Sequence, residues 1–220
     1  MWLDTSKLEA VIFDMDGVLF LSTDCHEQAY RETLQSIGIH HFSYSSLAGM
    51  RTDEAIKKVL AKNKHKITET LVSDLVARKR SKALELLEQA GVLREGCQEL
   101  VEHLTTAGYR LVLASSASPQ TIALFLRKSG LGKKFEFILD GSMVEHAKPA
   151  PDIYQLAIQK LKLEPSQCVV VEDAVSGIQA AQAAGTKVVA LTGTESQEKL
   201  MATKPEYIVD RLSEIGPILL

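Results

Sequence analysis

The sequence predicts an α/β fold in which a parallel sheet lies between two layers of helices and a block of helices is inserted after the first strand. From residue 92 onward, short apolar runs alternate with helical stretches, which is typical of a parallel sheet with helical crossovers. Between residues 24 and 91 the periodicity is helical, with almost no strand signal. We therefore expect a three-layer core formed by residues 1–22 and 93–220, and a helical cap formed by residues 23–92.

The N-terminal elements follow from hydrophobic periodicity and from residues that begin or end helices. An apolar run at residues 8–13 stops abruptly at Asp14, which indicates a short buried strand followed by a loop. Helices are expected at residues 24–38, 52–63 and 68–90. The insertion that contains them is about 65 residues long, which exceeds an ordinary crossover and indicates a separate helical subdomain.

The remaining chain alternates between helices and strands, each bounded by glycine, proline or a polar residue. Helices are expected at residues 95–107, 119–129, 151–161 and 174–184, and strands at residues 110–114, 135–139, 168–171, 187–191 and 207–209. No internal repeat or low-complexity linker interrupts this pattern, so these strands should join the first strand in one sheet.

Composition and charge narrow the classes of partner. The 220 residues are 45% hydrophobic and 24% charged, which suits a globular protein with a proper core. The formal net charge is −3, and the basic residues at 78–82 are expected to form one solvated helix face. We expect no nucleic-acid partner and no membrane association, and we take a monomer as the default.

The cysteines and the N-terminal segment indicate the cellular compartment of the protein. Cys25, Cys97 and Cys168 are odd in number and far apart, unlike a disulfide framework or a zinc site. Residues 1–17 lack the basic flank and apolar run of a secretion signal, and no apolar stretch approaches membrane-spanning length. These features favour a cytoplasmic protein.

Polar side chains interrupt the apolar runs where the expected strands end, which is the edge where open parallel sheets bind ligands. They are Asp14 and Asp16 after the first strand, Ser115 after the second, Glu172 and Asp173 after a later one, and Lys148 before the helix that precedes that later strand. Segments remote in sequence are therefore expected to converge on one site.

Such a set favours phosphoryl transfer. Clustered carboxylates repel one another, and a divalent cation with hard oxygen ligands, above all Mg²⁺, removes that conflict. The cation and Lys148 could neutralise a phosphoryl group whose oxygens Ser115 holds. A carboxylate could then attack as a nucleophile through an acyl-phosphate.

Four segments carry a resemblance to a known family. In chain order they are VIFDMDGVLF, LVLASSAS, AKPAPDIY and VVVEDAVSGIQAAQAAG. In order and spacing they resemble the four motifs of the haloacid dehalogenase superfamily, over nearly the whole chain. The resemblance implies a Rossmann-like core, and the helical insertion resembles the cap of the subgroup that includes phosphoglycolate phosphatase, sugar-phosphate phosphatases and β-phosphoglucomutase.

The resemblance also implies roles for the residues that match its motifs. Asp14 would be the nucleophile and a Mg²⁺ ligand. Asp16 would be the general acid and base, with its backbone carbonyl on the metal. Asp173 would bind Mg²⁺, with Glu172 bound through water or supporting from nearby. Lys148 would neutralise the nucleophile and the transferring group.

Ser115 would hydrogen-bond the phosphoryl oxygens, with Ser116 and Ser118 as neighbouring alternatives. A structural explanation also exists for each motif residue: aspartates after a strand favour turns, acids suit helix N-termini, and a lysine before a proline is often a surface residue.

The cap offers weaker candidates. His26 stands where related members often carry a histidine, and it could contact Asp16 or the substrate; a half-buried histidine of the first cap helix is the alternative. Gly49, Arg51 and Lys79 resemble a substrate-facing loop and a cap lysine, and simple surface positions would explain them equally. Closure of the cap would bend segments near residues 18–24 and 91–97.

The leading functional hypothesis is a magnesium-dependent phosphatase that acts on a small phosphorylated substrate. A β-phosphoglucomutase-like sugar phosphomutase is the alternative, in which Arg51 would hold a second phosphate. A phosphonate-cleaving enzyme would need a cap lysine such as Lys58, Lys64 or Lys79, and an inactive binding protein is a third class. Dehalogenase members lack the second acid, so Asp16 argues against that reaction.

Two departures from the family pattern are visible. Relatives commonly carry an acid and a hydroxyl after the first motif, where this chain has Leu21 and Ser22. The second core segment begins with Glu95-Gly96 in place of Pro-Gly. Ser22 keeps a hydroxyl at its position, whereas Leu21 removes the acid.

Overall fold

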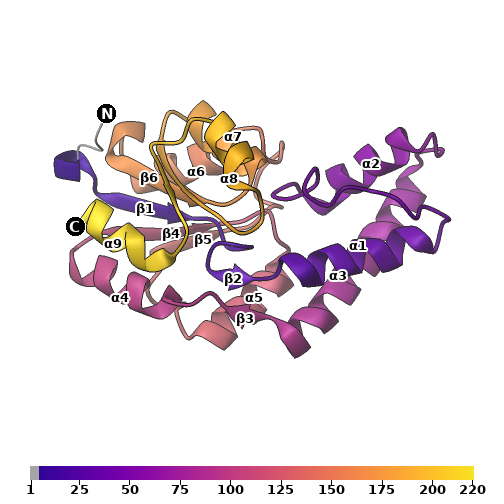
Figure 1. Cartoon of the computed structure of the whole chain (residues 1–220), viewed down its shortest axis with the longest axis horizontal. Helices are drawn as coiled ribbons and strands as arrows, with labels where there is room; N and C mark the ends of the chain where they lie inside the picture. The colour runs from indigo at the N-terminus through magenta and orange to yellow at the C-terminus, as the bar shows by residue number, and fades with distance from the viewer. Residues whose placement is uncertain (1–4) are drawn as a thin grey trace.

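A parallel sheet of six strands forms the centre of the protein (Figure 1). The computed structural model describes residues 5–220. Along the sheet the strands are β5 (Phe137–Leu139), β4 (Arg110–Ala114), β1 (Ala10–Phe13), β6 (Cys168–Glu172), β7 (Lys187–Leu191) and β8 (Tyr207–Val209). The first strand therefore lies in the middle, between two strands that come much later in the chain, as expected for a doubly wound sheet.

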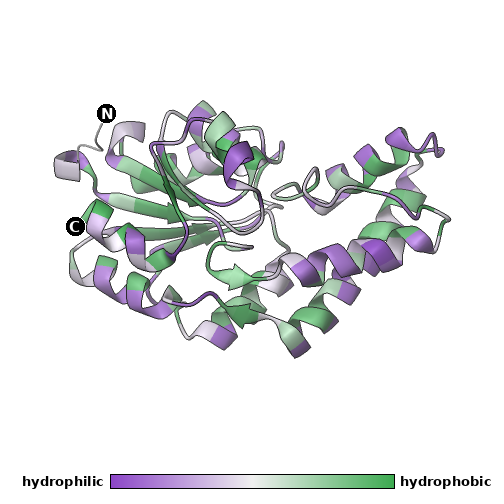
Figure 2. Cartoon of the chain, viewed as in Figure 1, coloured by the Kyte–Doolittle hydropathy of each residue, from purple (hydrophilic) through white to green (hydrophobic). Residues whose placement is uncertain are grey.

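Helices cover both faces of this sheet. One layer contains α4 (Cys97–Thr106), α5 (Pro119–Ser129) and α9 (Ile215–Leu219), and the other contains α6 (Asp152–Leu161), α7 (Val175–Ala183) and α8 (Gln197–Ala202). In β1, Val11 and Phe13 face the first layer, while Ala10 and Ile12 face the second. Figure 2 shows the central strands in the hydrophobic colour, as strands buried on both faces require. The predicted three-layer α/β class is confirmed.

The insertion between β1 and β4 is helical. It consists of α1 (Thr23–Gln35), α2 (Thr52–Lys62) and α3 (Glu69–Ala90), and extends away from the sheet on the side opposite the chain termini (Figure 1). Its apolar residues form a separate cluster that includes Leu34, Ile56 and Leu75.

The longest helix of the insertion begins where the sequence predicts. The hydroxyl of Thr68 accepts the amide hydrogen of Leu71, which caps the N-terminus of α3.

The two chain crossings between core and insertion pair with each other. The short strands β2 (Phe20–Leu21) and β3 (Val92–Leu93) are antiparallel, with Phe20 opposite Leu93. Periodicity does not reveal strands of two residues, so the sequence marks these segments only as expected bending points.

Other differences are at element boundaries or in short elements. The fifth strand begins at Phe137, two residues later than expected, and the six-residue α8 and five-residue α9 were not predicted. Short 3₁₀ turns lie at Thr5–Lys7, Pro165–Gln167 and Leu212–Glu214. Across residues 5–220, none of the helices combines the length and the apolar character that crossing a membrane requires.

Candidate active site

The carboxyl ends of the central strands bring the motif residues together. Phe13 of β1 pairs with Leu113 on one side and with Val171 on the other, so the residues that follow the three strands reach the same edge. Asp14, Ser115 and Glu172 are all at this edge and almost inaccessible to solvent. The site therefore lies on both sides of β1, where the winding direction of the sheet reverses.

Lys148 is the centre of a buried charge network. Its ammonium donates to Asp14 Oδ1 at 2.5 Å and to Glu172 Oε1 at 2.7 Å, and its side chain is fully buried. Burial alone would lower the pKa of Lys148, but the charges of Asp14 and Glu172 outweigh burial and raise it well above its ordinary value. The lysine is therefore a fixed positive charge at neutral pH.

Glu172 holds this lysine in place. Its Oε1 also accepts the hydroxyl of Tyr154 at 2.8 Å, and its Oε2 accepts the backbone amides of Asp173 and Ala174 at 2.9 and 3.1 Å. Both carboxylate oxygens are thus occupied by protein donors, which suits a supporting role better than direct metal ligation. Tyr154 is not predicted as a site residue from the sequence, where its only signal is its place in the segment AKPAPDIY.

The carboxylates fit a divalent cation. One oxygen from each of Asp14, Glu172 and Asp173 lies within 4.8 Å of the others. Asp173 Oδ2 is buried without a hydrogen-bond partner, and burial, followed by the neighbouring carboxylates, raises the pKa of Asp173 well above its ordinary value. A hard cation with oxygen ligands would relieve both the missing partner and the repulsion.

Gly17 explains how the backbone approaches this cluster. Its φ is +80°, and a Cβ there would lie 1.8 Å from Asp173 Oδ2. A side chain would therefore strain the turn after Asp16 and push Asp173 out of the cluster.

Asp16 belongs to a second network that reaches into the insertion. Its Oδ1 accepts the Ser22 hydroxyl at 2.6 Å and lies 3.2 Å from His26 Nε2. His26 Nδ1 lies 3.1 Å from the ammonium of Lys79. A neutral imidazole with its hydrogen on Nε2 satisfies both neighbours, because it donates to Asp16 and accepts from Lys79.

The pKa values of this network agree with that assignment. Burial, followed by the charge of Lys79, lowers the pKa of His26. Burial alone would raise the pKa of Asp16. The interactions with His26 and Ser22 outweigh burial, so the pKa of Asp16 lies below its ordinary value. Burial lowers the pKa of Lys79 to about 8, while its ammonium lies 4.4 Å from the Tyr30 ring centre.

A cavity between the core and the insertion joins the two networks. The volume of this cavity, including its opening to solvent, is about 560 Å³. Of the residues expected from sequence, it is lined by Asp14, Asp16, His26, Gly49, Lys79, Ser115 and Ser116. Residues from both parts of the chain therefore face one space beside Asp14.

The serines after β4 have different partners. Ser115 is buried, and its hydroxyl accepts the amide of Ala117 at 3.1 Å. The Ser116 hydroxyl donates to the carbonyl of Gly49 at 2.8 Å, which ties the insertion to the core. Gly49 has a φ of +75°, and a Cβ there would lie 2.4 Å from the Ser176 hydroxyl, so this close approach requires glycine.

Arg51 is not brought to this cavity. Its guanidinium pairs with Asp53 and Glu54 in the first turn of α2, which Arg51 precedes, and donates to the carbonyls of Val144 and Glu145 at 3.1 Å. It lines a neighbouring crevice and connects the insertion to the loop that precedes Lys148. The sequence pattern at this position does not reveal these local partners.

Comparison with known proteins places the chain in a class. A family model described as haloacid dehalogenase-like hydrolase matches residues 8–185. The protein belongs to this family of hydrolases, which confirms the resemblance found in the sequence.

Individual relatives within this family of hydrolases are similar to the chain over most of its length. Protein CbbY of Rhodobacter capsulatus is 31% identical over 198 residues, which cover 86% of this chain and 87% of that protein. A solved structure of a CbbY mutant from Rhodobacter sphaeroides, in complex with xylulose-(1,5)bisphosphate, is 27% identical with a TM-score of 0.82, covering 95% and 96% of the two chains. A β-phosphoglucomutase from Clostridium difficile is 25% identical with a TM-score of 0.84, covering 94% and 93%.

Proposed function

We propose that the protein is a magnesium-dependent phosphatase that hydrolyses a small phosphorylated metabolite, a sugar phosphate or a similar monoester, through an aspartyl-phosphate on Asp14. The observation that carries this proposal is the buried contact of 2.5 Å between Lys148 and Asp14, beside an acidic cluster in which Asp173 Oδ2 has no partner. Such a site stabilises a dianionic phosphoryl group next to a carboxylate nucleophile.

In the first step an oxygen of Asp14 attacks phosphorus, and the bond from phosphorus to the leaving oxygen breaks. Lys148 offsets the negative charge of the nucleophile and the transferring group, while Ser115 and nearby amides hold phosphoryl oxygens. Asp16 gives a proton to the leaving oxygen. A substrate dianion beside Asp14 favours this proton on Asp16, because added negative charge raises the pKa of a neighbouring carboxyl.

In the second step the ionised Asp16 takes a proton from water, which attacks phosphorus and breaks its bond to Asp14. Ser22 and His26 hold the Asp16 carboxylate for this step through contacts of 2.6 and 3.2 Å. Phosphate is released and Asp14 is regenerated, so the same residue acts as acid and then as base.

Mg²⁺ would be held by Asp14, Asp173 and the backbone carbonyl of Asp16, with Glu172 supporting the site or binding through water. When bound, it supplies positive charge that offsets the carboxylates and the phosphoryl oxygens. The all-oxygen cluster and the unpartnered Asp173 oxygen support this choice.

The proposal includes the predicted division of the chain into a core of residues 1–22 and 93–220 and a cap of residues 23–92. His26, Gly49 and Lys79 of the cap face the cavity and would contribute to substrate selection. A cytoplasmic location and a monomeric state stay predictions from the sequence.

A phosphomutase is the second candidate, favoured by the likeness to a solved β-phosphoglucomutase. A mutase must hold a second phosphate with the cap, and Arg51 was the residue considered for that role. Its guanidinium is engaged with Asp53, Glu54 and two core carbonyls, which favours hydrolysis.

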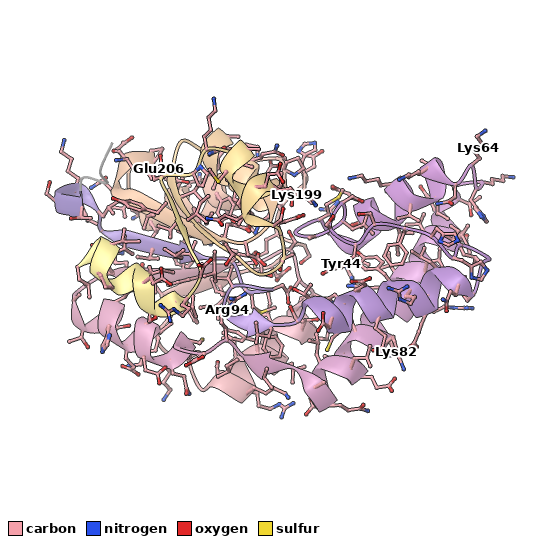
Figure 3. All side chains as sticks on the ribbon, viewed as in Figure 1. Tyr44, Lys64, Lys82, Arg94, Lys199 and Glu206 are labelled. Atoms are coloured by element: carbon pink, nitrogen blue, oxygen red, sulfur yellow. The ribbon has the colours of Figure 1, made fainter. Side chains whose placement is uncertain are left out.

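A phosphonate-cleaving reaction would need a lysine of the cap at the site. Lys58 donates to the carbonyl of Ser46, and Lys64 lies at the end of the insertion far from the sheet (Figure 3). Lys79 lines the cavity, and its pKa of about 8 would leave part of it neutral and nucleophilic near that pH. An aldehyde phosphonate therefore belongs among the compounds to test.

Phosphorus NMR tests the proposal. The protein is incubated with Mg²⁺ and a panel of phosphorylated metabolites that includes β-glucose 1-phosphate. We expect free phosphate from one or a few compounds and none from the Asp14→Asn variant. A resonance that moves between sugar positions with little free phosphate would replace hydrolysis by the mutase reaction, and binding without turnover would favour an inactive binding protein.

A further inference from the structure

Tyr44 is a cavity residue that no motif marks. It lies in the loop that joins α1 to α2, beside α1, and lines the cavity together with Asp14, Asp16 and Ser115 (Figure 3). The insertion therefore contributes an aromatic residue with a hydroxyl group to the cavity that also holds the candidate nucleophile and general acid.

The other hydroxyl groups that line this cavity have partners within the protein. Ser115 accepts from the Ala117 amide and keeps its own hydrogen for a phosphoryl oxygen, Ser116 donates to the Gly49 carbonyl, Ser118 pairs with Thr121, and Tyr30 pairs with Thr52. Among the cavity residues that the structure describes, Tyr44 alone has a hydroxyl without a hydrogen-bond partner. This group is therefore free to bond a molecule that enters the cavity.

The ring of Tyr44 is held in position by its neighbours. Its centroid lies 6.2 Å from that of Tyr30, with an angle of 49° between the rings, and Tyr30 in turn contacts Phe42. A phenylalanine would make the same ring contacts, so packing alone does not require the hydroxyl. Tyr44 is half-buried, so its hydroxyl is accessible to a molecule that enters the cavity.

The surroundings keep this hydroxyl protonated and able to donate. Burial raises the pKa of Tyr44 well above its ordinary value, and the charges of Asp16, Asp173 and Glu27 and the Tyr30 hydroxyl act in the same direction. The phenol is therefore a neutral hydrogen-bond donor at neutral pH.

We propose that the Tyr44 hydroxyl donates a hydrogen bond to a hydroxyl oxygen in the nonreacting part of the substrate, so that the site selects polyhydroxylated phosphomonoesters over those without hydroxyl groups. This proposal rests on the proposed function and names the chemical class of its substrate. A site built to bond a substrate hydroxyl discriminates against an analogue that lacks it, because the protein group is then left unpaired.

The test compares two tyrosine variants on two substrates. Tyr44→Phe removes only the oxygen, and Tyr109→Phe is the matched control, since that hydroxyl donates to the carbonyl of Leu219 away from the cavity. The ratio of kcat/KM for β-glucose 1-phosphate to kcat/KM for propyl phosphate is measured with Mg²⁺. We expect Tyr44→Phe to lower this ratio roughly 3- to 10-fold, as one hydrogen bond to a neutral group allows, and Tyr109→Phe to leave it unchanged.

Equal losses on both substrates, or no loss on either, would overturn the role of Tyr44. A binding measurement separates this failure from a failure of the proposed function. In the Asp14→Asn background, calorimetry gives the dissociation constants of β-glucose 1-phosphate and inorganic phosphate without turnover. Tyr44→Phe should weaken only the sugar phosphate, and an unchanged ratio of the two constants would contradict the proposal even if the wild type hydrolyses nothing.

Discussion

Lys148 of the core and Lys79 of the insertion are both buried beside the candidate site, but their charges are balanced differently. Lys148 contacts two carboxylates at 2.5 and 2.7 Å, and these raise its pKa well above the ordinary value. Lys79 contacts an imidazole and an aromatic ring, and burial lowers its pKa to about 8. Burial acts on both side chains in the same direction, so the carboxylates make the difference.

This difference separates a fixed charge from an adjustable one. The core lysine stays positive at every working pH and suits neutralisation of the nucleophile and the phosphoryl group. The cap lysine changes its charge near pH 8, and it acts on Asp16 through its charge and through the His26 side chain that lies between them. Under the proposed function, the core would carry the chemistry, whereas the cap would tune the acid and the choice of substrate.

The largest effect is expected from Lys148→Met. It should lower kcat by roughly 10²- to 10³-fold and destabilise the fold by about 3–5 kcal/mol, because Glu172 and Asp14 are left buried without their partner. Steady-state kinetics and urea unfolding measure the two losses. The control Lys134→Met removes a partly exposed pair with Glu102 and should change stability by less than about 1 kcal/mol.

A double variant, Lys148→Met with Glu172→Gln, separates charge balance from catalysis. It should regain part of the stability, since one uncompensated carboxylate is gone, and none of the activity. Recovery of activity would show that Lys148 only offsets Glu172 and does not act on the phosphoryl group.

The next effect concerns the metal. Asp173→Asn should weaken Mg²⁺ binding roughly 10- to 100-fold, because the Oδ2 atom without a hydrogen-bond partner is available to bind the cation. In EDTA the same variant should unfold at a higher temperature than the wild type, because burial and the neighbouring carboxylates oppose the charge of Asp173. Thermal unfolding with and without Mg²⁺ measures both effects. An unchanged response to Mg²⁺ would move the metal away from Asp173.

Lys79→Met gives a smaller effect that depends on pH. The folded protein holds the pKa of Lys79 at about 8, below the ordinary value of 10.5, so folding disfavours the charged form. Between these two pH values the unfolded chain binds more protons, and wild-type stability should rise with pH relative to the variant, by at most about 3 kcal/mol. Urea midpoints from pH 7 to about 10 follow this difference. A flat difference would mean that Lys79 keeps an ordinary pKa in the folded protein.

The smallest effect is expected from Arg51→Met. Its contacts with Val144 and Glu145 join the cap to the loop before Lys148, but the guanidinium is partly exposed and its acidic partners are local. We expect KM to rise by a few-fold and stability to change by about 1 kcal/mol or less. A loss of more than about a hundredfold in kcat/KM would mean that Arg51 binds substrate, as the mutase hypothesis requires.

The sequence predicted which core residues converge better than it predicted the contacts of the cap, for a physical reason. Asp14 and Ser115 follow apolar strands and Glu172 ends one, and the parallel sheet alone brings them to one edge. The contact of His26 with Asp16 and Lys79 depends on how α1 packs on α3, which periodicity does not fix.

Tyr44 lies in an irregular loop that offers no periodic signal at all. The expectation that the basic residues at 78–82 form one solvated helix face is wrong for Lys79. Its side chain is buried in the stripe of α3 between Leu75 and Ala83, at a position that would normally be apolar. A charged residue at such a position indicates either an error in the predicted helix face or a functional group, and the structure assigns it to the cavity.

The central claim is that the phosphoryl group passes through Asp14, and rapid-quench mass spectrometry of the Asp16→Asn variant with p-nitrophenyl phosphate tests it most directly. The leaving group of this compound needs no proton from Asp16, whereas the second step still lacks its base, so the covalent intermediate should accumulate. With Mg²⁺ present, we predict one phosphoryl group on the peptide that contains Asp14, and none when Asp14→Asn is added. A phosphoryl group on another residue, or hydrolysis of p-nitrophenyl phosphate by the wild type with no covalent species in the variant, would contradict the account.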